Sequence, residues 1–211
     1  MNISREDLRV YAVTDRAWAA DEPELFRQIE AAVRGGVLVV QLREKNLSPS
    51  DFLEEAKRFV RLCRRLGALS IINDRAETAL EAGADGVHVG QSDLEAGRAR
   101  ELLGPDKIIG VSAHSAEEAR LAQTAGADYL GCGAAFATGT KADAKPILKD
   151  TIRAVTAAVD IPVVAIGGVS RENLLELRGL GLSGVAVVSG IFAQKDPEAA
   201  ARELRSLAER L

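Results

Sequence analysis

Eight short apolar runs that alternate with stretches of helical period are the feature of this sequence that most restricts its fold. The runs are Val10–Thr14, Val37–Leu42, Leu69–Ile72, Gly86–Val89, Lys107–Val111, Tyr129–Gly131, Pro162–Ile166 and Gly184–Val188. The helix-patterned stretches between and after them include Pro23–Arg34, Ser50–Leu66, Glu95–Leu103, Ala116–Thr124, Arg171–Leu180 and Pro197–Leu211. Continuous apolar strands separated by helices are typical of a parallel sheet covered by helices.

A weak internal repeat narrows the architecture further. The sequence of residues 82–87 recurs with small changes at residues 125–130, and it is echoed at residues 34–37 and 181–185. Each copy ends a predicted helix with glycine, where a left-handed cap costs least, and then enters a strand. Eight such β/α units joined by right-handed crossovers close into a barrel. We therefore predict a single-domain (β/α)₈ TIM barrel over residues 1–211, a length that suits this α/β fold.

An open, doubly wound sheet is the main alternative architecture. Such a sheet usually carries a glycine-rich fingerprint after its first strand. The residues after the first predicted strand here, Thr14–Trp18, show no such fingerprint. The barrel is therefore the favoured prediction.

Charge and cysteine content restrict the partners of the chain. The formal net charge is −4 and the basic residues are scattered, so no basic stripe suggests nucleic acid or an anionic membrane as a partner. Cys63 and Cys132 lack metal-ligand spacing and are expected to be reduced thiols. The segment Asn2–Arg9 is polar, and no apolar run approaches the roughly 20 residues that span a bilayer. A cytoplasmic location is expected, and the oligomeric state, a homo-oligomer included, is left open.

Polar residues at the end of the second predicted strand form a candidate anion site. In a TIM barrel the chemistry lies at the carboxyl ends of the strands. Because side chains alternate along a strand, Gln41, Arg43 and Lys45 share one face, while Leu42 and Glu44 share the other. Two positive charges are thus expected at the barrel mouth. A surface loop with solvated charges is the alternative interpretation.

The next two strand ends carry a candidate magnesium site. Asn73 and Asp74 end the third strand, and Asp93 follows the fourth. Adjacent strands lie about 4.8 Å apart, so both carboxylates can reach one space. Mg²⁺ is typically bound by one or two carboxylates together with phosphate oxygens and water. Each aspartate could equally cap the following helix, and residues 74–77 have the spacing of a capping box.

Two further strand ends offer polar groups to a substrate. Ser112 follows the fifth strand and could donate to a phosphate oxygen. His114 and His88 could act as general bases, although a packed or hydrogen-bonded structural histidine is the favoured interpretation of each. The loop 133–145 after the sixth strand contains Thr138, Thr140 and Lys141, as expected for a phosphate-gripping lid. A flexible loop with a solvated lysine is the alternative.

The last two strand ends predict a second anion site. Phosphate sites in TIM barrels are commonly built from the loops after strands seven and eight. Gly167 and Gly168 permit a close backbone approach, and Ser189 with Gly190 is expected to open a helix whose N-terminus favours an anion. These glycines could instead serve only tight turns. Two anion sites at one barrel mouth suggest two phosphorylated small-molecule substrates.

The assembled motifs resemble those of the thiamine phosphate synthase family over essentially the whole chain. The most specific pieces are Gln41–Lys45, Ile72–Asp74, Gly86–Gln91 with Asp93, and Thr138–Lys141. The resemblance implies transfer of an aminopyrimidinylmethyl group from its diphosphate to a thiazole ethyl phosphate. Departures from the family pattern are Arg75, Ala134, Ala137 and Gly190, none of which removes a charged group from the site.

The resemblance also implies a role for each site residue, and Mg²⁺ as the cofactor. The pyrimidine diphosphate would be contacted by Gln41, Arg43, Lys45, Asn73, Ser112 and Lys141, of which Arg43, Lys45 and Lys141 would be catalytic. The thiazole phosphate would be contacted by Thr138, Thr140, Gly168, Val188 and Ser189. Asp74 and Asp93 would hold the metal. The leaving diphosphate would be stabilised electrostatically, with no catalytic base.

Three other functions remain as alternatives. A thiazole tautomerase on a related barrel would need a proton-transferring residue such as His114 but no metal pair. A phosphosugar epimerase would use the loops after strands seven and eight and leave Arg43, Lys45, Asp74 and Asp93 unexplained. A non-catalytic binder of thiamine precursors would carry the same charges, and only an assay distinguishes it from an enzyme.

Overall fold

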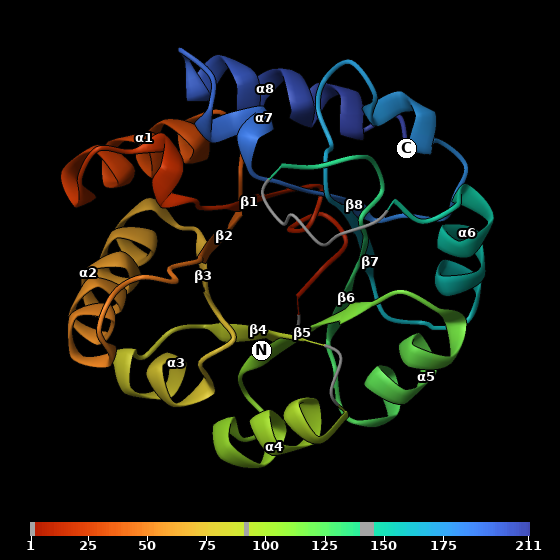
Figure 1. Ribbon diagram of the computed structural model, residues 1–211, viewed down its shortest axis with the longest axis horizontal. Helices are drawn as coiled ribbons and strands as arrows, with labels where there is room; N and C mark the ends of the chain where they lie inside the picture. Colours follow the sequence, from red (N-terminus) through yellow and green to blue (C-terminus); the bar gives the residue numbers. More distant parts are fainter. Residues whose placement is uncertain (1–2, 91–92, 140–145) are drawn as a thin grey trace.

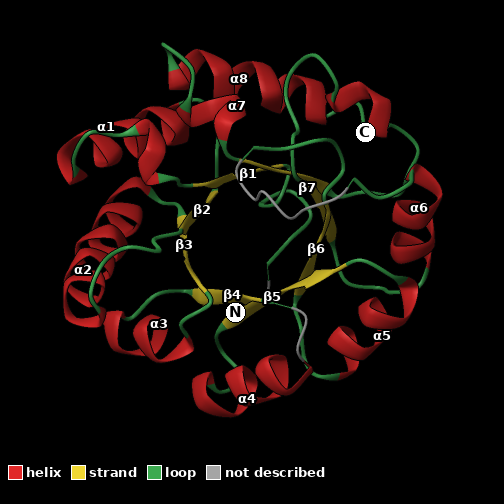
Figure 2. Cartoon of the chain, viewed as in Figure 1, coloured by secondary structure: helices red, strands yellow, loops and turns green. Residues whose placement is uncertain are grey.

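Eight parallel strands close into a barrel surrounded by helices (Figures 1 and 2). The computed structural model describes residues 3–90, 93–139 and 146–211. The strands are β1 (Val10–Val13), β2 (Val39–Leu42), β3 (Leu69–Asn73), β4 (Gly86–Val89), β5 (Ile108–Ala113), β6 (Tyr129–Gly133), β7 (Val163–Ile166) and β8 (Gly184–Val187). Each pairs in parallel with the next, and β1 pairs with β8. The predicted TIM barrel is confirmed, with a strand at each of the eight apolar runs.

The helices form the outer ring. They are α1 (Glu22–Arg34), α2 (Pro49–Leu66), α3 (Ala76–Ala82), α4 (Asp93–Leu103), α5 (Ala116–Thr124), α6 (Lys149–Ala157), α7 (Ser189–Phe192) and α8 (Pro197–Ala208), with 3₁₀ helices η1 (Arg16–Trp18) and η2 (Leu174–Leu177). Side-chain oxygens of Asp21, Ser48, Ser115 and Asp196 accept backbone N–H bonds where α1, α2, α5 and α8 begin. Such caps satisfy donors that a helix leaves unpaired, which fixes where these helices start.

Strand alternation divides the core into two layers. Side chains such as Val10 and Ala12 pack outward against the helices. Tyr11 and Val13 point inward and pack with the inward residues of other strands, among them Ile71, Ile108, Tyr129 and Val164. These inward side chains fill the barrel interior, as is usual in TIM barrels.

One predicted helix was wrong. Arg171–Leu180 was expected to be helical, but only the short 3₁₀ helix η2 (Leu174–Leu177) forms there. Gly179 and Gly181, near the end of the segment, adopt φ values of 75° and 78°, which turn the chain out of a helical path. In the parts of the chain that the structure describes, no helix is long and apolar enough to cross a membrane.

Candidate active site at the strand ends

A pocket opens at the carboxyl ends of the strands. Its lining includes most of the predicted site residues that the structure describes: Gln41, Arg43, Lys45, Asn73, Asp74, Ser112, Thr138, Gly168, Val188 and Ser189. His88 and His114 line it as well. Residues that are far apart in the sequence thus meet at the carboxyl ends of the strands, where the active site was predicted. Thr140 and Lys141 lie outside the described residues, as does the side chain of Asp93 at the start of α4.

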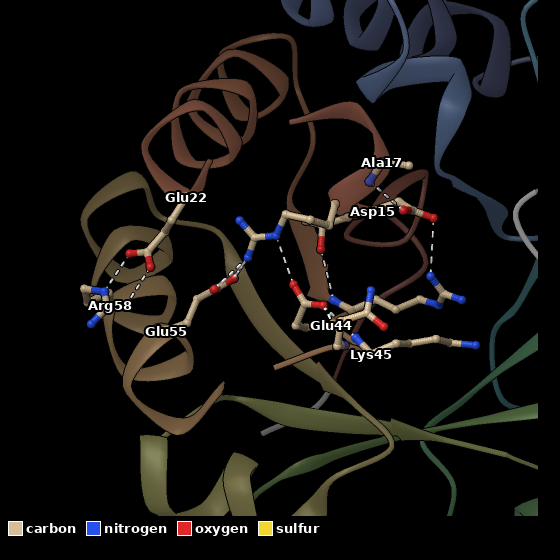
Figure 3. Close-up of polar contacts among 11 residues, drawn as sticks. Asp15, Ala17, Glu22, Glu44, Lys45, Glu55 and Arg58 are labelled. Carbon is tan, nitrogen blue, oxygen red and sulfur yellow. Dashed lines mark hydrogen bonds and ion pairs between the residues drawn. The ribbon is translucent and has the colours of Figure 1, made fainter. Parts of the chain in front are cut away.

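The positively charged wall of the pocket follows β2. Gln41, Arg43 and Lys45 all line the pocket, which confirms the alternation predicted for this strand end. Glu44 faces the other way and accepts from Arg16 Nε at 3.0 Å, whereas the side chain of Lys45 extends away from it (Figure 3). The two cations therefore point into the pocket, while the carboxylate between them in sequence points out of it.

Arg43 is held from two sides by the end of β1. Its backbone N–H donates to Thr14 Oγ1 at 3.0 Å, and its Nη1 lies 3.3 Å from Asp15 Oδ2. Asp15 also caps η1, because its side chain accepts from the backbone N–H of Ala17. The Arg43 and Asp15 side chains are 16% and 18% exposed, so this pair is largely shielded from water. Such shielding strengthens the interaction between the two charges.

Two carboxylates behind the β2 turn differ in their proton affinity. Burial alone would raise the pKa of Glu44, but hydrogen bonds from the Asn46 N–H and the Arg16 guanidinium outweigh it, so the pKa of Glu44 lies below its ordinary value. Burial raises the pKa of Glu55, against the opposing charge of Arg16. Glu44 is thus the better stabilised anion of the two.

Asp74 occupies an uncommon backbone conformation beside this wall. Its φ is 63°, a left-handed value that residues other than glycine rarely adopt. The capping interpretation does not hold for Asp74: the residue before α3 is Arg75, and no side chain caps that helix. Instead, Asp74 lines the pocket and its Oδ2 accepts from Asn73 Nδ2 at 2.6 Å. The guanidinium of Arg75 turns away and lies 5.0 Å from the ring centroid of Phe52.

A chain of hydrogen bonds crosses the barrel interior beneath the pocket. Gln41 Nε2 donates to Tyr11 Oη, which lies 2.8 Å from Tyr129 Oη. Tyr129 Oη lies 3.0 Å from His88 Nδ1, and His88 Nε2 lies 3.2 Å from Ser112 Oγ. Burial raises the pKa of both tyrosines above its ordinary value. The phenols therefore stay protonated, and the chain links two polar groups of the pocket, Gln41 and Ser112.

The two histidines differ in their surroundings. His88 is only 8% exposed and hydrogen-bonds through both ring nitrogens, as the structural interpretation predicted. The His114 side chain is 41% exposed, and its Nδ1 lies 3.5 Å from Glu118 Oε2. Its backbone N–H also donates to that carboxylate at 2.7 Å. Glu118 thereby holds the position of His114 at the end of β5.

The turn after β7 and the loop after β6 pack together at another part of the rim. Gly168 has φ of 65°, and a Cβ there would lie 2.3 Å from the carbonyl oxygen of Ala137. Only glycine fits this approach. Asn173 braces the turn, because its Nδ2 donates to Gly168 O and its Oδ1 accepts from Ser170 N–H, both at 2.9 Å. Ser189 and Val188 line the pocket beside this turn.

Several residues that shape the site were not predicted from the sequence. Asp15 and Arg16 follow β1 just as Arg43 follows β2, so their polarity at a strand end was an available signal. Tyr11 and Tyr129 lie within apolar strands, where an aromatic residue gives no sign of a polar contact. Glu55 lies on the buried face of α2, and its pairing with Arg16 depends on how that helix packs.

Comparison with known proteins agrees with this geometry. The family described as "Thiamine monophosphate synthase" matches residues 10–191. The thiamine-phosphate synthase of Ruminiclostridium cellulolyticum is 46% identical over 201 residues, which cover 95% of each chain. That of Chloroflexus aurantiacus is 48% identical over 202 residues, covering 95% of this chain and 93% of the relative.

A solved structure gives the same result in three dimensions. Thiamine phosphate pyrophosphorylase from Pyrococcus furiosus matches with a TM-score of 0.87 and 37% identity, covering 97% of both chains. The family match, the curated relatives and this structure all extend over nearly the whole barrel. The chain therefore belongs to the thiamine monophosphate synthase family.

Proposed function

We propose that this protein is a thiamine phosphate synthase, a transferase built on one catalytic barrel. It moves the 4-amino-2-methylpyrimidin-5-ylmethyl group from its diphosphate to the ring nitrogen of a thiazole ethyl phosphate and releases pyrophosphate. Family membership supports this reaction class. The observation that carries the proposal is the placement of Arg43 and Lys45 in a pocket whose rim also presents Gly168 and Ser189.

Arg43 and Lys45 stabilise the departing charge. The bond that breaks joins the pyrimidine methylene carbon to a diphosphate oxygen, and its electron pair leaves with the diphosphate. Fixed cations aimed at this oxygen lower the barrier because they need no reorganisation when the charge develops. Asp15 and Thr14 hold Arg43 in place before the substrate arrives. The sequence adds Lys141, which lies outside the described residues, as a third cation.

The new bond forms without a catalytic base. The aminopyrimidine ring delocalises the positive charge left on its methylene carbon. The lone pair of the thiazole nitrogen then forms the carbon–nitrogen bond, so no proton needs to be transferred in either step. Holding the two reactants side by side makes the attack effectively intramolecular. This mechanism agrees with the structural surroundings of His88, whose ring nitrogens contact Tyr129 and Ser112.

The two substrates are assigned to different parts of the rim. The pyrimidine diphosphate contacts the β2–β3 side, and the thiazole phosphate contacts the β7–β8 side. The first set comprises Gln41, Arg43, Lys45, Asn73, Ser112 and Lys141. The second set comprises Thr138, Thr140, Gly168, Val188 and Ser189. The pocket contains every member of both sets that the structure describes, which supports the assignment.

Mg²⁺ is the proposed cofactor, with Asp74 and Asp93 as its ligands. Asp74 offers a hard carboxylate oxygen at the pocket, and its side chain is not consumed in capping α3. This donor fits Mg²⁺, which uses one or two carboxylates together with substrate phosphates. When bound, the metal would neutralise negative charge on the diphosphate oxygens. The strained backbone of Asp74 supports a role for this side chain in the site.

An assay with both precursors tests the proposal. Purified protein, the pyrimidine diphosphate, the thiazole ethyl phosphate and Mg²⁺ should yield thiamine phosphate and pyrophosphate in equal amounts. Omitting either substrate or chelating the metal should abolish both products. No thiamine phosphate above the chelated control would refute the synthase. Isomerisation of a thiazole phosphate without use of the pyrimidine diphosphate would indicate the tautomerase instead.

A further inference from the structure

Three charged side chains lie behind the turn that carries Arg43 and Lys45. We name Arg16, Glu44 and Glu55 the Arg16 cluster, which joins η1, the turn after β2 and helix α2 (Figure 3). Arg16 Nε donates to Glu44 Oε2 at 3.0 Å. Its Nη2 lies 2.6 Å from both carboxylate oxygens of Glu55. One guanidinium therefore bridges two carboxylates from different elements.

The burial of the cluster separates it from ordinary surface ion pairs. The side chains of Glu44 and Glu55 are 5% and 3% exposed, and that of Arg16 is 27% exposed. Solvated pairs contribute little to stability, whereas a buried carboxylate that loses its counter-charge is strongly destabilising. Both carboxylates depend on the same guanidinium, so the position of Arg16 determines where Glu44 can lie.

Glu44 connects Arg16 to the backbone of the turn. While Oε2 accepts from Arg16, Oε1 accepts from the backbone N–H groups of Lys45 at 2.8 Å and Asn46 at 3.0 Å. A single carboxylate thus fixes two successive peptide units directly after Arg43. This bonding sets the direction in which Lys45 leaves the backbone.

The cluster also keeps a negative charge out of the pocket. Glu44 lies between Arg43 and Lys45 in the sequence, and a free carboxylate there would be a counter-ion for either cation. Because Arg16 holds Glu44 toward α2, Glu44 adds no counter-charge beside Lys45 and none beyond that which Asp15 already gives Arg43. The preceding residue, Asp15, contacts Arg43 in the same way that Arg16 contacts Glu44. Two consecutive residues after β1 therefore restrain two consecutive residues after β2.

We propose that Arg16 is a positioning residue, which acts through Glu44 to orient Lys45 and Arg43 toward the diphosphate group of the substrate. The inference rests on the proposed synthase function for the identity of the ligand. The geometry of the turn is independent of that proposed function. Arg16 touches neither substrate, and its effect appears in binding of the diphosphate and not of the thiazole phosphate.

Two variants and one control isolate this effect. Arg16→Lys keeps the charge but cannot bridge both carboxylates with one planar fork. The double variant Arg16→Gln with Glu55→Gln removes the guanidinium without leaving Glu55 as an unpaired buried charge. Arg58→Gln is the matched control, because Arg58 also makes two 2.6 Å bonds to a carboxylate, that of Glu22, and neither residue bonds to the turn after β2.

The first readout is the KM for each substrate. Both Arg16 variants should raise the KM for the pyrimidine diphosphate by at least about ten-fold, the size expected when a charge-assisted contact is weakened. The KM for the thiazole phosphate should change by less than about two-fold, and Arg58→Gln should leave both values unchanged. Equal effects on the two substrates would overturn the proposal, since a merely structural role predicts them.

The second readout does not depend on catalysis. Amide hydrogen exchange of Lys45 and Asn46, followed by NMR, should be faster in both Arg16 variants than in Arg58→Gln, because their N–H groups bond to Glu44. Titration with inorganic pyrophosphate should show weaker binding in the same variants. Unchanged exchange at Lys45 and Asn46 would overturn the positioning role even in an active synthase. A wild-type protein without synthase activity but with the predicted exchange pattern would refute the function and leave the positioning role supported.

Discussion

The backbone of Asp74 is strained at the edge of the pocket. Left-handed φ values cost residues other than glycine about 1–2 kcal/mol, although aspartate tolerates them better than most residues do. The φ of 63° at Asp74 is retained while its side chain makes no helix cap. Strain of this kind persists where function selects for it. At the scale of one residue, stability and activity should therefore respond in opposite ways to substitution.

Asp74→Gly tests this opposition. Glycine relieves the left-handed backbone, so the thermal unfolding midpoint should stay the same or rise. The loss of the carboxylate should lower kcat/KM by at least about a hundred-fold, the scale of one missing electrostatic group at a developing charge. Asp74→Asn is the control, because it keeps the shape of the side chain and removes only its charge. Near-normal activity of both variants would show that the carboxylate has no catalytic or metal-binding role.

At the scale of elements, the sequence predicted the strands better than their side-chain partners. Eight apolar runs and strand alternation were enough to place Gln41, Arg43 and Lys45 in one pocket. The helix at residues 171–180 was wrong: only the 3₁₀ helix at Leu174–Leu177 forms, and the positive φ values of Gly179 and Gly181 prevent its continuation. The Arg16 cluster and the Gln41–Ser112 hydrogen-bond chain depend on contacts between elements far apart in sequence. The pattern of apolar and polar residues along the sequence does not show such contacts.

Gly110 of β5 makes the hydrogen-bond chain sterically possible. A Cβ at Gly110 would lie 2.3 Å from Tyr129 Oη and 2.5 Å from His88 Nδ1. Gly110→Ala should therefore lower the free energy of unfolding by about 1–3 kcal/mol, the usual cost of overpacking a core. Urea unfolding measures this change. Gly97→Ala in α4 is the control: its Cβ would meet nothing within 4 Å, so it should stabilise the protein by up to about 1 kcal/mol. Equal effects of the two changes would contradict the packing described at Gly110.

At the scale of the whole molecule, the barrel interior combines an apolar core with buried phenols. Tyr11 and Tyr129 lie among Val39, Ile71 and Val164, and each is at most 1% exposed. Their hydroxyl groups hydrogen-bond to each other, to Gln41 and to His88. The same burial that organises the floor of the pocket makes global stability sensitive to alkaline pH.

Stability should fall from about pH 9, where the unfolded thiols begin to ionise, and more steeply above about pH 10. Burial raises the pKa of Tyr11 and Tyr129 above the ordinary value of 10.0. The unfolded chain then loses these protons at a lower pH than the folded chain does. Their stabilising effect is therefore complete below pH 10 and declines as the pH rises, by at most about 1.4 kcal/mol per pH unit for each group. Cys63 and Cys132 act in the same direction, because burial raises the pKa of each above 9.0 and that of Cys132 to about 12.

A variant separates the tyrosine contribution from that of the thiols. Tyr129→Phe lacks one titrating group, so its free energy of unfolding should decline less steeply with pH than that of the wild type. Its overall stability should also be lower at neutral pH, because Tyr11 and His88 lose a partner. Denaturant titrations between about pH 8 and pH 11 measure both effects. Parallel declines in the two proteins would rule out Tyr129 as a contributor.

The central claim is that one pocket binds a diphosphate on its β2–β3 side and a monophosphate on its β7–β8 side. The most direct test is a crossed measurement of KM in Arg43→Ala and Ser189→Ala, with each substrate varied at saturating levels of the other. Arg43→Ala should raise the KM for the pyrimidine diphosphate by about ten-fold or more and leave that for the thiazole phosphate within about two-fold. Ser189→Ala should do the reverse. The same substrate affected in both variants, or both substrates affected equally in each, would contradict the two-sided pocket.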